Sequence, residues 1–135
     1  MKPNEFLDSI YVGDRACKGI VIDSWRKEVK IHIDAISRVR GETWDFYTAE
    51  DVEDGFLVFE GVDQLAFDPP GRIPDDEMGD IEFVGYEGER FTVNIDIGSV
   101  EQTDGKVRFH NVKLTIRAKA VAIEKPGEEG ARIRD

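Results

Sequence analysis

Polar and apolar residues alternate along much of this chain, which is the pattern of a strand with one face on a core and the other in water. The stretch Lys18–Ala35 alternates on both sides of an interruption at Asp23–Lys27, and its apolar positions are rich in isoleucine and valine. Because β-branched residues suit a pleated surface, this stretch predicts two antiparallel strands joined by a turn. The alternation is cleanest from Phe91 to Ile97, and the Asp104–Gly105 pair beyond it favours a second hairpin turn.

The apolar parity changes in the last third of the chain. Val107 and Phe109 are apolar on odd positions, whereas the apolar residues from Val112 onward lie on even positions. An inserted residue, a β-bulge or a strand that crosses between sheets would each shift the parity across His110–Asn111. Each explanation predicts that Phe109 and Val112 both face apolar surroundings.

Other segments depart from simple alternation. Apolar residues in Phe6–Tyr11 recur at i, i+1, i+4 and i+5, which predicts one or two helical turns docked on a sheet. Phe56–Phe59 is apolar on both parities, as in a strand covered on both faces. Glu50–Gly55 predicts an acidic loop that ends in a glycine with positive φ. Three prolines and two glycines between Asp68 and Asp80 make the longest break.

These elements predict an all-β chain: an antiparallel β-sandwich, or a partly open barrel, with a short N-terminal helix. A length of 135 residues suits one domain over 1–135, with a Gly/Glu/Arg-rich tail at 126–135 that is expected to fray. The single cysteine, Cys17, excludes an intrachain disulfide, and it is expected to be a small buried hydrophobe. With no apolar leader or membrane-length segment, the expected location is the reducing cytoplasm.

The net charge of −11 is concentrated in the middle of the chain. Residues 41–105 carry 2 basic residues against 19 acidic ones, a balance of −17, whereas residues 1–40 and 106–135 have balances of +2 and +4. This distribution is typical of a well-solvated surface, or of a face that attracts a basic partner. Either interpretation disfavours binding to nucleic acid phosphates or to an anionic membrane.

Motifs that carry catalysis or bind nucleotides are missing from the sequence. It has no Gly-x-Ser-x-Gly elbow, no phosphate-binding glycine loop and no zinc-type Cys/His spacing, so no cofactor is expected. His32 and His110 are the two histidines, and two surface imidazoles are the simplest interpretation. The carboxylates of Asp75, Asp76, Glu77 and Asp80 are weak candidates for calcium ligands, because their spacing does not match the twelve-residue loop.

Aromatic residues supply the other candidate contacts. Trp25 falls in the predicted hairpin turn, where it either folds back to cap the core, the favoured interpretation, or belongs to an interface. Trp44, Phe46 and Tyr47 are expected to belong to the core with one partly exposed ring, and an aromatic platform for sugars is the alternative.

Two segments, Phe6–Arg15 (FLDSIYVGDR) and Ile36–Arg40 (ISRVR), resemble a family of small bacterial proteins of unknown function. The resemblance implies a bacterial source and a single domain, and it implies no activity or site. By analogy alone, some small acidic bacterial β proteins are immunity partners of toxins.

The sequence therefore favours a non-enzymatic binding protein whose acidic centre, including Asp51, Glu53 and Asp54, meets a basic protein partner such as a toxin. Trp25 favours a homodimer that forms outside residues 41–105, since two acidic surfaces repel each other. Alternatives are a small-ligand or carbohydrate-binding module that uses the tryptophans and Tyr47, and a hydrolase that uses Asp or Glu with His32 or His110.

Overall fold

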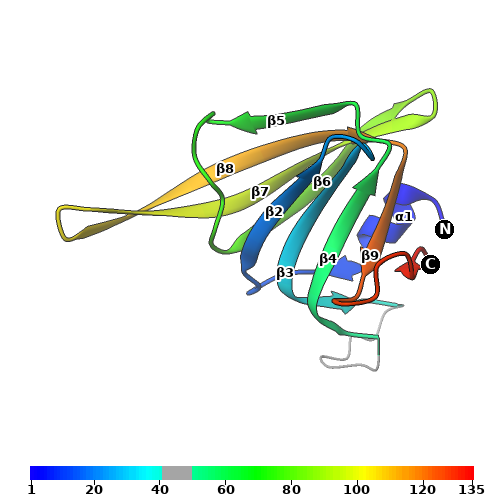
Figure 1. Ribbon diagram of the computed structural model, residues 1–135, viewed down its shortest axis with the longest axis horizontal. Helices are drawn as coiled ribbons and strands as arrows, with labels where there is room; N and C mark the ends of the chain where they lie inside the picture. The colour runs from blue at the N-terminus through cyan, green and yellow to red at the C-terminus, as the bar shows by residue number, and fades with distance from the viewer. Residues whose placement is uncertain (41–49) are drawn as a thin grey trace.

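The computed structural model describes residues 1–40 and 50–135 and shows two antiparallel sheets with one short helix (Figure 1). The elements are α1 (Pro3–Asp8), β1 (Ile10–Tyr11), β2 (Cys17–Asp23), β3 (Glu28–Arg38), β4 (Val52–Glu60), β5 (Gln64–Asp68), β6 (Met78–Glu87), β7 (Arg90–Thr103), β8 (Lys106–Ala118), β9 (Ala120–Glu124) and β10 (Arg132–Ile133). The sandwich-like all-β fold and the N-terminal helix agree with the sequence prediction.

Sheet one has the strand order β1-β3-β4-β9-β10, with β2 also paired to β3, and sheet two has the order β5-β8-β7-β6. On one side the sheets are tied together, because Cys17 donates its amide to the Asp76 carbonyl and Met78 donates its amide to the Arg15 carbonyl, at 2.8 and 2.7 Å. Within residues 1–40 and 50–135 the two sheets do not close into a barrel, so the sandwich alternative holds.

The core lies between the sheets and consists of the inward parity of the alternating strands. Phe6 and Leu7 of α1 are buried against it, as is Cys17, whose burial raises the pKa of its thiol. Fully buried side chains come from both sheets: Ile31, Ile33, Ile36, Leu57, Phe59, Ile95, Ile97, Leu114, Ile116 and Ile123. The Asp104–Gly105 turn has positive φ at both residues, 53° and 73°, which confirms the predicted hairpin between β7 and β8.

The prediction of a bulge or sheet crossing at His110–Asn111 is wrong. β8 is continuous from Lys106 to Ala118 and pairs with β7 without a register shift. Val112 is fully buried, whereas Phe109 is 73% exposed. The physical reason is that the hairpin extends beyond the core, so no opposing sheet selects the apolar face there (Figure 1). We call residues 100–109 the arm.

The segment 69–77 joins β5 to β6 across the base of the arm. Ser99 donates its hydroxyl to the Ile73 carbonyl at 2.8 Å, and Val100 donates its amide to Asp75 Oδ1 at 2.9 Å. Pro74 is buried, and its carbonyl lies 3.8 Å from Cys17 Sγ. The proline-rich segment therefore covers one end of the core.

At the C-terminal end, β10 pairs with β9 in the register Arg132↔Glu124 and Ile133↔Ile123. Glu129, in the preceding loop, reaches across to Lys30 of β3, with Nζ and Oε1 3.7 Å apart. The fraying expected of residues 126–135 stays a prediction, and these contacts are the ones that would oppose it.

Candidate functional site

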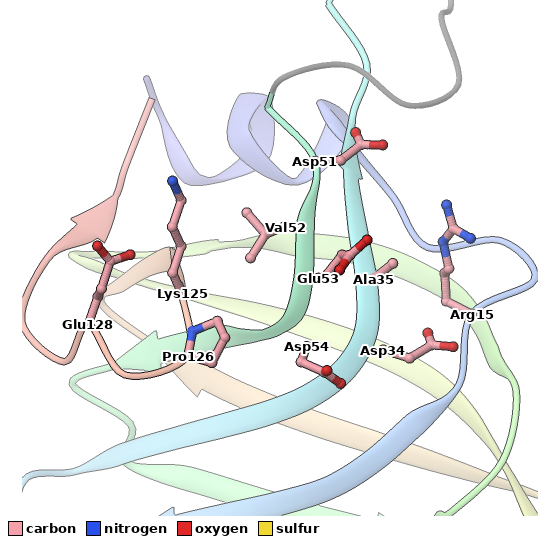
Figure 2. Close-up of a pocket in the computed structure, with 10 residues that line it drawn as sticks. All are labelled: Arg15, Asp34, Ala35, Asp51, Val52, Glu53, Asp54, Lys125, Pro126 and Glu128. Carbon is pink, nitrogen blue, oxygen red and sulfur yellow. The ribbon is translucent and has the colours of Figure 1, made fainter.

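A hollow of about 820 Å³ lies at the end of sheet one where β3 and β4 meet the loop after β9 (Figure 2). We call it the acidic groove. Its charged lining is Asp34, Asp51, Glu53, Asp54 and Glu128, with Arg15 and Lys125 as the two cations. Five carboxylates against two cations leave the groove with a negative excess.

The backbone of β4 explains why adjacent residues both reach the groove. Asp54 has φ of 52°, in the left-handed region that aspartate tolerates better than most residues, and this interrupts the alternation. Glu53 and Asp54 are consequently both exposed, while Val52 is buried beside them. Position 55 leaves no room for a side chain in this arrangement, because a Cβ there would lie 2.6 Å from Val52 Cγ1. The expected acidic loop is thus the start of β4, and the positive φ falls on Asp54 instead of the glycine.

The groove carboxylates differ in their partners: Asp54 pairs with a cation, and Asp34 accepts a hydrogen bond from a backbone amide. Lys18 Nζ lies 2.6 Å from Asp54 Oδ1, and this hydrogen bond and charge lower the pKa of Asp54. Asp34 Oδ1 accepts the Ala16 amide at 3.0 Å. Within residues 1–40 and 50–135, the carboxylates of Glu53 and Glu128 have no cation in contact. They are the groups left to attract an incoming positive charge.

Three of the predicted interaction residues, Asp51, Glu53 and Asp54, are therefore brought together in one groove. Trp44, Phe46 and Tyr47 lie outside the described residues, and so the aromatic surface proposed for a carbohydrate rests on Trp25 alone. Trp25 is 94% exposed, which shows that the core-capping interpretation is wrong. Beside this turn, Val62 belongs to the core, and its amide donates to the Lys27 carbonyl at 2.8 Å.

The four calcium candidates lie in the loop before β6 and near the start of that strand. Asp75 Oδ1 accepts the Val100 amide, and the Asp75 and Asp76 amides both donate to the Gly98 carbonyl at 3.0 Å. In the part of the chain that the structure describes, no three His, Cys, Asp or Glu side chains converge closely enough to hold a metal ion.

Each histidine lies beside one carboxylate. His110 Nε2 is 2.9 Å from Glu101 Oε2, and hydrogen bonds from His110, Thr103 and Arg72 lower the pKa of Glu101. His32 stacks on Phe56 with ring centroids 4.6 Å apart, and its Nε2 is 3.8 Å from Asp54. The lowered pKa values of Glu101 and Asp54 favour the ionised form of both carboxylates, which disfavours a role as general acid.

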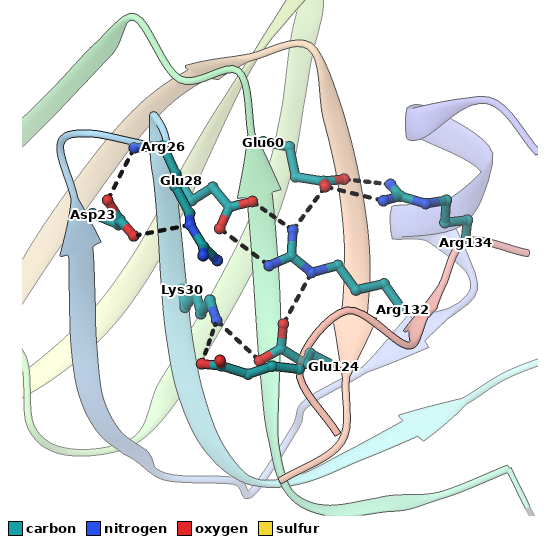
Figure 3. A network of polar contacts seen from close by, with 9 residues as sticks. Asp23, Arg26, Glu28, Lys30, Glu60, Glu124, Arg132 and Arg134 are labelled. Atoms are coloured by element: carbon teal, nitrogen blue, oxygen red, sulfur yellow. Dashed lines mark hydrogen bonds and ion pairs between the residues drawn. The ribbon is translucent and has the colours of Figure 1, made fainter. Parts of the chain in front are cut away.

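A second polar cluster, which sequence reasoning missed, lies on the outer face of sheet one (Figure 3). Arg132 of β10 donates to Glu28 of β3, Glu60 of β4 and Glu124 of β9, at 2.6, 2.7 and 2.9 Å. Lys30 also pairs with Glu124 at 3.0 Å, and Arg134 pairs with Glu60. We call this set the Arg132 network.

The centre of the network is buried despite its charge, whereas Arg134 at its edge is half exposed. The side chains of Glu124 and Arg132 are 2% and 9% exposed, and Val58 and Ala122 on the same face are fully buried. The hydrogen bonds to carboxylates raise the pKa of Arg132, and the guanidinium donors lower the pKa values of Glu28 and Glu60. The only sequence signal was the sharing of the polar parity by Glu28 and Lys30, which does not reveal a partner about 100 residues away.

No helix within residues 1–40 and 50–135 is long and apolar enough to cross a membrane. The fold and the groove together define a sandwich-like all-β protein with an acidic surface hollow. The chain belongs to a family of unknown function, DUF6258, whose model matches residues 1–135, and this confirms the resemblance to an uncharacterised family. Neither the curated proteins nor the solved structures contain a match to it.

Proposed function

We propose that this protein is a non-enzymatic, cytoplasmic binding protein that receives a basic protein partner in the acidic groove. The observation that carries the proposal is the convergence of Asp51, Glu53 and Asp54 with Asp34 and Glu128 on one hollow. An immunity-type inhibitor of a basic toxin is the narrower form of the same proposal.

Electrostatics supports a basic partner in two ways. The balance of −17 over residues 41–105 creates a field that speeds the approach of a positively charged protein. The hollow then offers the carboxylates of Glu53 and Glu128, which no cation within residues 1–40 and 50–135 contacts. The same field opposes nucleic acid and anionic membranes.

The test uses a fluorescent decalysine peptide and the full chain. Reversing the groove charges with D51K, E53K and D54K should weaken binding by about tenfold or more, because each exposed pair contributes about 0.2–1 kcal/mol. Reversing Asp80, Glu82 and Glu89, which are exposed outside the groove, changes the net charge equally and should weaken binding by less than about threefold.

Equal losses in the two triple variants would show that only net charge matters and would overturn the groove as the binding site. Failure of the natural chain to bind decalysine at low salt would overturn the proposal itself. The narrower form predicts that a basic toxin encoded by a neighbouring gene binds with the same ranking of variants.

We also propose that the chain self-associates through a surface outside residues 41–105. Trp25 supports this proposal, because a tryptophan that is 94% exposed at a hairpin tip leaves a large apolar area in water.

A further inference from the structure

The free strand edges of the two sheets differ in how they are protected. Edge strands of protein sheets are usually protected against pairing with other chains by short length, bulges or charges, because their unpaired backbone groups can bind another strand. β1 and β10 have two residues each, and β5 has five. β6 has register irregularities at Met78/Ile81 and at Phe83/Gly85, and it exposes Asp80 and Glu82.

The edge of β2 lacks these protections along most of its length. The segment 76–77 covers its beginning, through the Ala16↔Glu77 bridge and the Cys17 amide, and its one register shift lies between Cys17 and Gly19. From Gly19 to Asp23, β2 pairs only with β3 within the described residues. The first four residues of this stretch, Gly19 to Ile22, carry no charge, and Asp23 lies at its end.

Apolar side chains accompany this open edge. Val21 is 47% exposed and Ile22 is 53% exposed, and the exposed Trp25 lies just past the end of the strand. An edge of uncharged, β-branched residues next to an exposed tryptophan favours edge-to-edge pairing.

We propose that β2 pairs antiparallel with β2 of a second copy, centred on Val21, so that sheet one continues across a two-fold axis. This proposal rests on the self-association proposed above and does not depend on the acidic groove. Val21 is the middle of the free segment Gly19–Asp23, so this register pairs the greatest length of edge.

The charges favour a second copy as the occupant. Lys18, which also contacts Asp54 of its own chain, lies at one end of the free edge, and Asp23, which accepts from the Arg26 amide, lies at the other. Antiparallel pairing therefore brings the Lys18 end of each copy to the Asp23 end of its partner and keeps like charges apart. Residues 1–40 have a balance of +2, so two copies meet where they do not repel. A basic partner would gain less here than at the acidic groove.

Sedimentation velocity of the full chain tests the interface. At about 100 μM the natural chain should be mainly dimeric if the dissociation constant is micromolar. Val21→Lys places two ammonium groups side by side at the axis and should weaken the dimer by about tenfold or more. Val84→Lys is the matched control, since Val84 is a similarly exposed valine on β6, and its dimer should be unchanged.

A monomeric natural chain at that concentration, or a dimer that survives Val21→Lys, would overturn the proposal. Circular dichroism establishes that both variants fold. Decalysine binding by the Val21→Lys variant should match that of the natural chain, so loss of the dimer and loss of the groove are distinguishable.

Cysteine scanning tests the register in a Cys17→Ala background. Two-fold antiparallel pairing places one residue of β2 opposite its own copy, with Cα atoms about 4.5–5.5 Å apart, within the range of a disulfide. Among single cysteines at positions 19–23, the one at 21 should oxidise to a covalent dimer fastest. Equal rates at all five positions, or no covalent dimer, would contradict the paired edge.

Discussion

The outer face of sheet one and the arm of β7–β8 both lie outside the core, and they invert the usual rule of burial. On sheet one, charged side chains are buried: Glu124 is 2% exposed and Arg132 is 9% exposed. On the arm, apolar side chains are exposed: Val107 at 51% and Phe109 at 73%.

The difference lies in what covers each region. Arg132 extends from β10 toward β4 and β3, and the loop before it reaches Lys30, so carboxylates of three strands share one enclosed guanidinium (Figure 3). The outer part of β7–β8 extends beyond the sandwich, and sheet one does not lie opposite it (Figure 1). Coverage by a distant segment, and not residue type, therefore decides burial at these two places.

The largest effect is expected from removing the guanidinium of the Arg132 network. Arg132→Met should lower the free energy of unfolding by about 3 kcal/mol, because Glu28, Glu60 and Glu124 would stay enclosed without their shared cation. Urea denaturation measures this. Arg108→Met, on the exposed arm, is the control and should change stability by less than about 0.5 kcal/mol. Equal losses of stability in the two variants would contradict the conclusion that the Arg132 network is covered and the arm is not.

Acid should weaken the covered region in a way that depends on Arg132. Hydrogen bonds from Arg132 and Arg134 lower the pKa values of Glu28 and Glu60 in the folded state. Their stabilising contribution is therefore fully present above the unfolded pKa of about 4.3 and is lost as pH falls through the lower folded values.

Urea midpoints recorded from pH 7 to pH 3 should consequently fall less steeply for Arg132→Met than for the natural chain. Glu101→Gln, at the base of the arm, is the comparison variant. Its urea midpoints should follow those of the natural chain with pH, because Glu101 is about one-third exposed and solvent screens its ion pairs. A parallel pH dependence in the natural chain and Arg132→Met would show that the network does not contribute to acid stability.

The smallest effect is expected on the arm. Phe109→Ser should change the free energy of unfolding by less than about 0.5 kcal/mol, because the ring is mostly in water and leaves no cavity. Thermal or urea unfolding of the monomer measures it. A loss above about 2 kcal/mol would show that the ring is covered in solution and that the arm belongs with the buried regions.

Local patterns in the sequence determined most of the secondary structure. The alternation from Phe91 to Ile97 set which side chains of β7 face the core, and Asp104–Gly105 set the turn after it, because period and turn chemistry act between near neighbours. The grouping of Asp51, Glu53 and Asp54 was also foreseeable, since these residues are adjacent in the chain.

Tertiary structure alone decided what lies opposite each face. The alternation of polar and apolar residues assigns Phe109 to one face of β8. Whether that face is covered depends on how far sheet one extends along the strand, and it does not reach Phe109. In the same way, Glu128 joins the acidic groove and Arg132 joins Glu28 because the chain after β9 folds back across sheet one. Sequence periodicity assigns residues to a face, whereas burial and ion pairing depend on segments about 75 to 100 residues apart, which no local pattern specifies.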